Sequence, residues 1–242
     1  MESDEFDSTS LGLQWQWPAV PSPYWYYCNA AEGNLRLYSA AQSEDWKNLW
    51  DSPNLLMQKF PSGDFTITTK LTFTPNPLLA QKGENCGLVI MGDSYATIRL
   101  TDTHEGVKLL LVECLNAHKG NEEAILFEKG IKSKELPVPS SNKYMSITLP
   151  PVKPLEYKKT VVYMRVEVEN TPRKDDVPDA LCTFSYSMDG TIWHQMNVNG
   201  NVYKFKARPG RWIGAKAGLY CNRFHSKNDS GWVEADWFRI SR

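Results

Sequence analysis

Residues 161–169 read VVYMRVEVE, a stretch in which apolar and polar side chains alternate. One face of such a stretch carries only apolar side chains: Val162, Met164, Val166 and Val168. Successive side chains of a strand point to opposite sides of its sheet. The period of two therefore predicts an antiparallel strand with one buried and one exposed face. Residues 64–73, DFTITTKLTF, repeat the pattern. Their apolar face consists of Phe65, Ile67, Leu71 and Phe73.

Short runs of the same kind recur along the chain and are separated by turn signals. The clearest signal is Asp189-Gly190 between FSYSM and TIWHQM, which predicts a β-hairpin. No segment shows a convincing 3.6-residue helical stripe, so the sequence predicts an all-β antiparallel sandwich. We expect one domain over residues 11–242, with residues 1–10 as a linker remnant or a first edge strand. The Pro-rich residues 149–157 are expected to form a long loop.

The charge of the chain argues against some classes of partner. The formal net charge is -1 over 242 residues, which gives no electrostatic basis for binding nucleic acid or an anionic membrane. No apolar run approaches the length of a transmembrane helix. The first residues, MESDEFDSTS, are acidic and polar and do not form a signal peptide. Removal of a signal or an upstream domain would hide the compartment; we expect a periplasmic or secreted protein rather than a cytoplasmic one.

The five cysteines, at positions 28, 86, 114, 182 and 221, are widely spaced and include no C-x-x-C pair. A zinc site is therefore not expected. The odd number leaves at least one thiol unpaired within the chain. Each cysteine lies in an apolar, strand-like context, which favours small buried side chains.

Three stretches together resemble a known family. They are LGLQWQWP at residues 11–18, FSYSMDGTIW at residues 184–193, and PGRWIGAKAGLYC with GWVEADWFRI within residues 209–240. GLVIMGDSYATIRL is similar to the middle strands of the same family. The chain resembles the concanavalin A-like β-sandwich, a jelly roll, that follows the catalytic propeller in family 43 glycoside hydrolases. The connection over residues 122–156 is longer than the family's usual one.

The resemblance implies an accessory module of a β-xylosidase or α-L-arabinofuranosidase, with xylan or arabinoxylan as its sugar and a catalytic β-propeller as its partner domain. It implies no catalytic residue in this chain. The acids, such as Glu113, Glu122 and Glu123, lie in no recognisable catalytic motif, and the four histidines show no metal or triad spacing. Two alternatives stay open: a stand-alone lectin-fold glycosidase or lyase, and a structural spacer without sugar contact.

Tryptophans are the candidate sugar-binding residues. Trp15 and Trp17 lie two residues apart and share one face of an extended strand, where rings either pack in the core or stack on a sugar. We expect at least one of them in the core, and Trp17 with Gln16 to offer a sugar-compatible patch. Trp212 follows the Pro209-Gly210 turn. The resemblance implies that Arg211 and Trp212 contact substrate or the partner domain, although Trp212 could instead pack inward.

The resemblance to lectin-like sandwiches also implies a structural calcium site. Asp236, on the expected last strand, would ligate the ion, with backbone carbonyls near Asp4 and Gly33 completing the site. Calcium favours such mixed carboxylate and carbonyl shells. The alternative for Asp236 is an ion pair with Arg239 or another basic residue.

Overall fold

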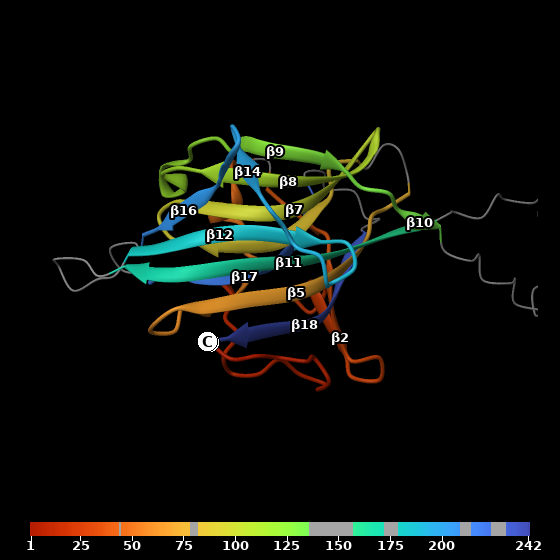
Figure 1. The fold of residues 1–242 in the computed structure, drawn as a ribbon. Helices are drawn as coiled ribbons and strands as arrows, with labels where there is room; N and C mark the ends of the chain where they lie inside the picture. The colour runs from red at the N-terminus through yellow and green to blue at the C-terminus, as the bar shows by residue number, and fades with distance from the viewer. Residues whose placement is uncertain (44, 78–81, 136–156, 172–178, 209–213, 224–230) are drawn as a thin grey trace, which may run out of the picture.

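The computed structural model describes residues 1–43, 45–77, 82–135, 157–171, 179–208, 214–223 and 231–242. Within these ranges the chain forms two packed β-sheets (Figure 1) and two short 3-10 helices, η1 (Leu49–Asp51) and η3 (Ala117–Lys119). Among the described strands, all pairs but one are antiparallel, and the exception is β3 with β17. The all-β antiparallel sandwich predicted from the sequence is confirmed. No described helix is long and apolar enough to cross a membrane. Most of the expected long loop, residues 149–156, lies outside the described ranges.

The first sheet has the strand order β1-β2-β18-β5-β11-β12-β13, with β10 beside β11 and β16 beside β12. Its strands are β1 (Tyr26–Asn29), β2 (Asn34–Tyr38), β5 (Phe65–Thr74), β10 (Lys134–Glu135), β11 (Lys158–Thr171), β12 (Asp179–Ser187), β13 (His194–Gln195), β16 (Lys204–Ala207) and β18 (Trp232–Ser241).

The second sheet has the order β3-β17-β6-β7-β8-β9, with β4 beside β17. Its strands are β3 (Ala40–Ala41), β4 (Leu56–Lys59), β6 (Asn85–Met91), β7 (Tyr95–Thr103), β8 (Gly106–Cys114), β9 (Ala124–Gly130) and β17 (Lys216–Arg223). A separate small ribbon pairs β14 (Asn197–Val198) with β15 (Asn201–Val202).

The alternating stretches occupy the middle of the first sheet. β5 and β11 are direct neighbours, with Ile67 opposite Val166. The predicted apolar face of each strand is buried in the core between the sheets, and the polar face points outward. The predicted hairpin is also confirmed, because β12 pairs with β13 across the turn at Gly190, whose φ is +78°. Glycine adopts this left-handed conformation without steric cost.

The middle of the second sheet is covered on both faces. A second apolar cluster lies on its outer face, where Leu49 and Leu55 pack with Val89, Tyr95 and Tyr220. Every residue of β6 is buried as a result, which explains why β6 reads as a continuous apolar run rather than an alternating one.

The cysteines have the expected packing role. Cys86, Cys114, Cys182 and Cys221 are buried, Cys28 is half-buried, and all five thiols are free. Burial raises the pKa of the Cys182 thiol to about 12 and that of Cys114 to about 11, so both stay protonated near neutral pH.

The N-terminal residues contact the last strand of the first sheet, and the backbone contact is a β-bridge. The backbone N–H and C=O groups of Asp4 pair with those of Phe238 on β18, at N···O distances of 2.8 Å each. Trp15 packs on this bridge, between the rings of Phe6 and Phe238. The Trp15 indole N–H donates to the Asp4 carboxylate at 2.8 Å. Trp15 is 7% exposed, so the expected core tryptophan is Trp15.

Truncation of this ring tests its core role. Trp15→Ala removes a buried aromatic and leaves Asp4 without its indole donor, so the free energy of unfolding should fall by roughly 3–5 kcal/mol. Urea unfolding followed by circular dichroism measures the change. Leu13→Ala is the control, because Leu13 is fully exposed in the same segment and should change stability by less than about 0.5 kcal/mol. Equal stability of the two variants would place Trp15 outside the core.

Candidate functional site

A cleft of about 800 Å³ opens where the β1–β2 hairpin meets the end of β17. We call it the aromatic cleft. It is lined by Ser22, Pro23, Tyr24, Trp25, Tyr26, Tyr27, Tyr38, Ser39, Ala40, Ala41 and Arg223. Its volume is within the range of pockets that hold small ligands, roughly 300–1,000 Å³.

The aromatic side chains of the cleft combine exposed and supported rings. Tyr24 is 84% and Tyr27 53% exposed. Trp25 is half-buried and packs on Trp17, with ring centroids 5.9 Å apart. Tyr26 also packs on Trp17, with ring centroids 5.4 Å apart. Trp17 therefore supports two rings of the cleft, Trp25 and Tyr26, by packing against both.

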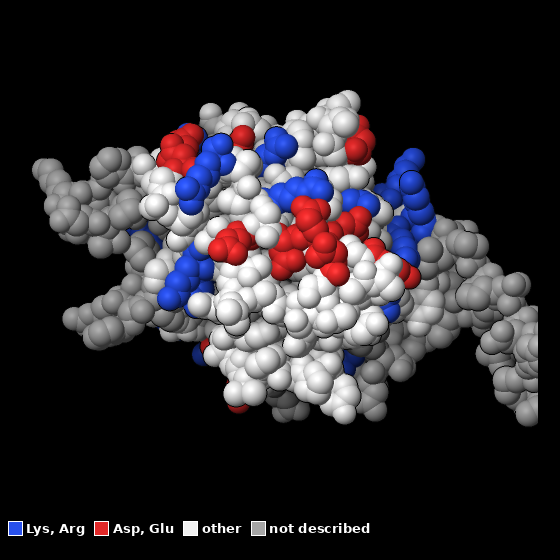
Figure 2. Space-filling model, turned by 90° about the horizontal axis from the view of Figure 1, so that it is seen from below, with Lys and Arg blue, Asp and Glu red and all other residues white. Residues whose placement is uncertain are grey.

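The segment that supplies most aromatic rings of the cleft carries no charged side chain. The segment from Ser8 to Ala31 contains no Asp, Glu, Lys or Arg, whereas four of the first seven residues are acidic. Figure 2 views the molecule from the lower edge of Figure 1 and shows a broad uncharged area beside a group of acidic side chains. Exposed aromatic rings on an uncharged segment are a typical site of ligand or partner contact.

Among the described residues, Arg223 is the one cation that lines the aromatic cleft. It ends β17, where its backbone lies opposite Ala41 of β3 in the parallel pair. The Nε and Nη1 atoms of Arg223 are buried and have no hydrogen-bond partner among the described residues.

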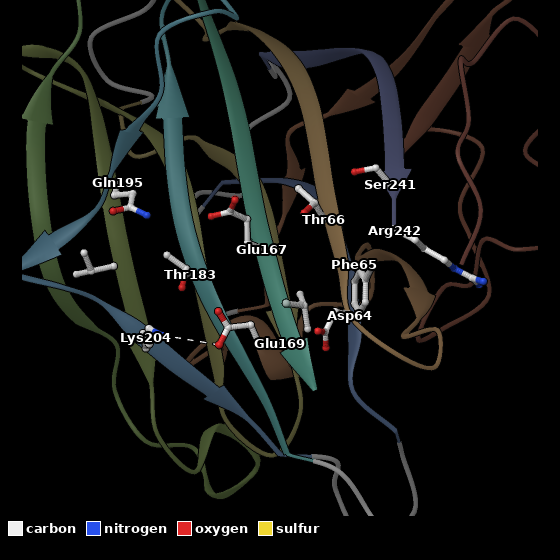
Figure 3. A pocket seen from close by; sticks show the side chains of 12 residues that line it. Asp64, Phe65, Thr66, Glu167, Glu169, Thr183, Gln195, Lys204, Ser241 and Arg242 are labelled. Atoms are coloured by element: carbon white, nitrogen blue, oxygen red, sulfur yellow. Dashed lines mark ion pairs between the residues drawn. The ribbon is translucent and has the colours of Figure 1, made fainter. Parts of the chain in front are cut away.

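A second concave surface, which we call the polar groove, lies on the outer face of the first sheet (Figure 3) and has a volume of about 480 Å³. Its floor is set by strand register: Glu167 of β11 lies between Thr66 of β5 and Thr183 of β12. An adjoining hollow of about 530 Å³ shares Glu167 and Gln195 with it. In that hollow, the Arg165 guanidinium stacks on Trp193, 3.7 Å from the ring centroid.

The polar groove contains carboxylates that sequence reasoning did not single out. Glu169 pairs with Lys204 at 3.8 Å, and Asp64 accepts a hydrogen bond from the Asn170 backbone N–H at 2.8 Å. Figure 3 shows Glu167 and Glu169 side by side along β11. The i, i+2 spacing on an alternating strand was the signal for this arrangement.

Two of the acids that the sequence analysis singled out, Glu113 and Glu123, have structural partners. Glu123 accepts from Arg99 at 2.8 Å and from the Tyr95 hydroxyl at 2.5 Å. Glu113 accepts from the Tyr203 hydroxyl at 2.7 Å. Burial, together with the Glu113 carboxylate, raises the pKa of Tyr203. These carboxylates stabilise the packing around the second sheet by accepting hydrogen bonds from buried or half-buried side chains.

The proposed sugar-contact residues lie in two different parts of the chain. Arg211 and Trp212 lie outside the described residues. Trp17 supports the aromatic cleft without lining it, and the Gln16 backbone forms a bridge with Met57. The residues that line the cleft were missed, although the aromatic run PYWYY at residues 23–27 was a visible signal.

The proposed calcium ligands have other contacts. The Asp236 carboxylate pairs with Lys70, and this hydrogen bond raises the pKa of Lys70. The Asp4 carboxylate accepts from Trp15, from Gln14 and from the Phe6 backbone N–H. Gly33 lies in the β1–β2 turn at a φ of +61°. Within the described residues, no group of three or more His, Cys, Asp or Glu side chains lies close enough to hold a metal ion.

Solved structures with a similar fold include proteins of glycoside hydrolase family 43. An engineered family 43 enzyme with endo-xylanase and exo-arabinofuranosidase activity is 18% identical, with a TM-score of 0.69 over 99% of this chain and 40% of its own. The GH43 BlXynB protein from Bacillus licheniformis is 18% identical, with a TM-score of 0.64 over 99% of this chain and 39% of its own. The bifunctional GH43-CE protein from Bacteroides eggerthii is 20% identical, with a TM-score of 0.63 over 99% of this chain and 25% of its own. This chain therefore spans between 25% and 40% of these proteins.

No curated protein sequence matches the chain. A family model does: residues 3–241 match the one described as "Beta xylosidase C-terminal Concanavalin A-like domain" of glycoside hydrolase family 43. This match covers nearly the whole chain and agrees with the sandwich and with the structural neighbours. The chain belongs to the family of concanavalin A-like C-terminal domains of family 43 glycoside hydrolases.

Proposed function

We propose that this chain is a non-catalytic accessory module that binds xylan or arabinoxylan oligosaccharides in the aromatic cleft. The observation that carries the proposal is the cleft itself, in which exposed Tyr24 and Tyr27 flank a supported Trp25. Aromatic faces stack on the apolar C–H face of a pyranose ring, and the tyrosine hydroxyls remain free to hydrogen-bond sugar hydroxyls. The family membership supplies the polysaccharide context.

The parent protein is proposed to carry a catalytic β-propeller beside this module, as implied by the family. In that setting, the module positions substrate for the propeller or shapes its active site. Arg211 and Trp212 are proposed to contact the substrate or the propeller. A periplasmic or secreted location is part of the same proposal, since polysaccharide substrates lie outside the cell.

A second candidate function is a stand-alone glycosidase or lyase. The observation that favours it is the polar groove, where Glu167 and Glu169 line one concave surface. Glycosidase chemistry requires one carboxylic acid and one carboxylate at a defined separation across the scissile bond. Because Glu169 already pairs with Lys204, we rank this candidate below the accessory role. A spacer without sugar contact is the third.

Truncation of the exposed rings tests the binding proposal. Tyr24→Ala and Tyr27→Ala should each weaken binding of xylo-oligosaccharides roughly five- to tenfold, because each removes about 1 kcal/mol of ring contact. Both variants should keep the wild-type melting temperature, since the removed rings are exposed. Titration of intrinsic fluorescence measures the affinity.

The matched control is Val20→Ala, which truncates an exposed side chain of the same uncharged segment that does not line the cleft. It should bind as the wild type does. If the wild-type protein binds no xylan or arabinan fragment, the sugar-binding proposal is wrong and the spacer role is the remaining candidate.

The accessory role also predicts an inactive chain. Purified protein should release no product from aryl xylosides or arabinofuranosides above a buffer blank. The glycosidase candidate predicts the opposite, with turnover that Glu167→Gln abolishes and Val20→Ala preserves. A colorimetric assay of product release at several pH values distinguishes the two.

Calcium binding at Asp236 remains a proposal with a simple test. If Asp236 ligates the ion, a chelator should lower the melting temperature and added calcium should restore it. Asp236→Ala should remove this response. If instead Asp236 only pairs with Lys70, the wild type will melt at the same temperature with and without chelator. Lys70→Met is the companion variant, because it breaks the ion pair without removing the carboxylate.

A further inference from the structure

Two of the five cysteines lie directly opposite one another on neighbouring strands of the second sheet. Cys86 of β6 is the register partner of Cys221 of β17. Directly opposite residues of an antiparallel pair place their side chains on the same face, so the two thiols are neighbours. Both belong to the apolar cluster between the sheets and are fully buried. The two side chains are also in hydrogen-bonding contact.

The backbone of this pair suits a disulfide bond. Facing residues of antiparallel strands have Cα atoms roughly 4.5–5.5 Å apart. Disulfides join cysteines whose Cα atoms are roughly 4.4–6.8 Å apart. The register of β6 and β17 therefore meets the distance requirement of a disulfide between Cys86 and Cys221.

The other three cysteines face residues of other types. Cys114 belongs to the apolar cluster on the outer face of the second sheet, and is therefore separated from the core pair by the sheet itself. The register partners are Leu35 for Cys28, Tyr95 for Cys114, and Val168 and Phe205 for Cys182. Among the described strand pairs, facing cysteines thus occur at Cys86 and Cys221 alone.

We propose that Cys86 and Cys221 form a disulfide bond that stabilises the sandwich when the chain folds in the presence of a disulfide oxidant, such as oxidised glutathione. One cysteine thiolate attacks the disulfide of the oxidant, which gives a mixed disulfide and releases one thiolate. The second cysteine thiolate then attacks the protein sulfur of the mixed disulfide and releases the other half of the oxidant. The two thiol protons pass to the released thiolates, so two protein thiols are oxidised and one oxidant disulfide is reduced.

The bond has to form before the sandwich closes. Burial, together with the hydrogen bond to the Cys86 thiol, raises the pKa of Cys221 well above its usual value. The thiolate, not the protonated thiol, is the nucleophile in this exchange. An oxidant in solution also has no access to two fully buried sulfurs. The folded, reduced protein should therefore resist the oxidant that links the pair during folding.

The bond would restrain one wall of the aromatic cleft. Cys221 lies two residues before Arg223, whose backbone faces Ala41 in the parallel pair of β17 and β3. Arg223 and Ala41 both line the cleft. β6, in contrast, is paired on both sides, with β17 and with β7. A bond to Cys86 therefore ties the end of β17 to the middle of the second sheet, whatever ligand the cleft binds.

Refolding with and without the oxidant tests the proposal. The full chain is unfolded in denaturant with a reductant and refolded in reduced glutathione alone or in a mixture of reduced and oxidised glutathione. After refolding in the mixture, peptide mapping by mass spectrometry without reductant should show the Cys86 and Cys221 peptides joined. The linked protein should melt roughly 5–15 °C above the reduced protein, because the bond restrains the unfolded chain. Native reduced protein placed in the same mixture should stay unlinked.

Variants assign the effect to the facing pair. Cys86→Ala and Cys221→Ala should each melt at the same temperature after both refolding conditions, because each leaves one thiol without its partner. Cys182→Ala is the matched control. It also removes a buried thiol but leaves the facing pair intact, so it should keep both the linked peptides and the shift in melting temperature.

Each outcome bears on the proposal. Folded wild-type protein that keeps both cysteines as thiols after oxidative refolding would overturn it, as would a bond from either one to a different cysteine. Linked protein with an unchanged melting temperature would overturn the stabilising role. If an alanine variant fails to fold, the wild-type peptide map still decides. If the wild type does not refold from denaturant, the same map of protein exported to the oxidising bacterial periplasm, compared with protein made in the cytoplasm, decides instead.

Discussion

The sandwich depends on the insertion of its last strand, β18, between β2 and β5 of the first sheet. The strand enters at Gly231, whose backbone N–H donates to the buried Glu84 carboxylate at 2.6 Å. The same carboxylate accepts the Asn76 N–H at 2.5 Å, so it ties the start of β18 to the end of β5. Burial raises the pKa of Glu84. Until β18 is in place, β2 and the β1–β2 hairpin have no sheet on which to pair, so the aromatic cleft requires the complete fold.

The two concave surfaces differ because the chain builds them in different ways. The polar groove is the outward face of regular strands, and its side chains follow strand register. The aromatic cleft forms where the β1–β2 hairpin, β3 and the end of β17 meet. Few backbone pairs hold this corner together. Trp17 supports two of its rings, Trp25 and Tyr26, by packing against them.

Much of the fold was predictable from local pattern. The alternation in β5 and β11 gave the correct buried faces, and Asp189-Gly190 gave the β12–β13 hairpin. The continuous apolar run of β6 was a weaker signal, because a strand covered on both faces has no period. The partners of Glu123 and Asp236 were not predictable, since Arg99 and Lys70 are distant in the sequence and are brought near by strand pairing.

The sequence by itself determined the fold class, the family and the core role of one of the paired tryptophans, because hydrophobic alternation and short motifs are local properties. The tertiary structure decided which tryptophan is buried and which residues line the cleft. Trp15 is buried because Phe238, more than two hundred residues away in sequence, packs against its ring. Arg223 lines the same cleft as Tyr24 and Trp25 only because β17 and the β1–β2 hairpin end at the same corner. Such contacts depend on strand order and register, which are set by the packing of the whole sandwich rather than by any short segment.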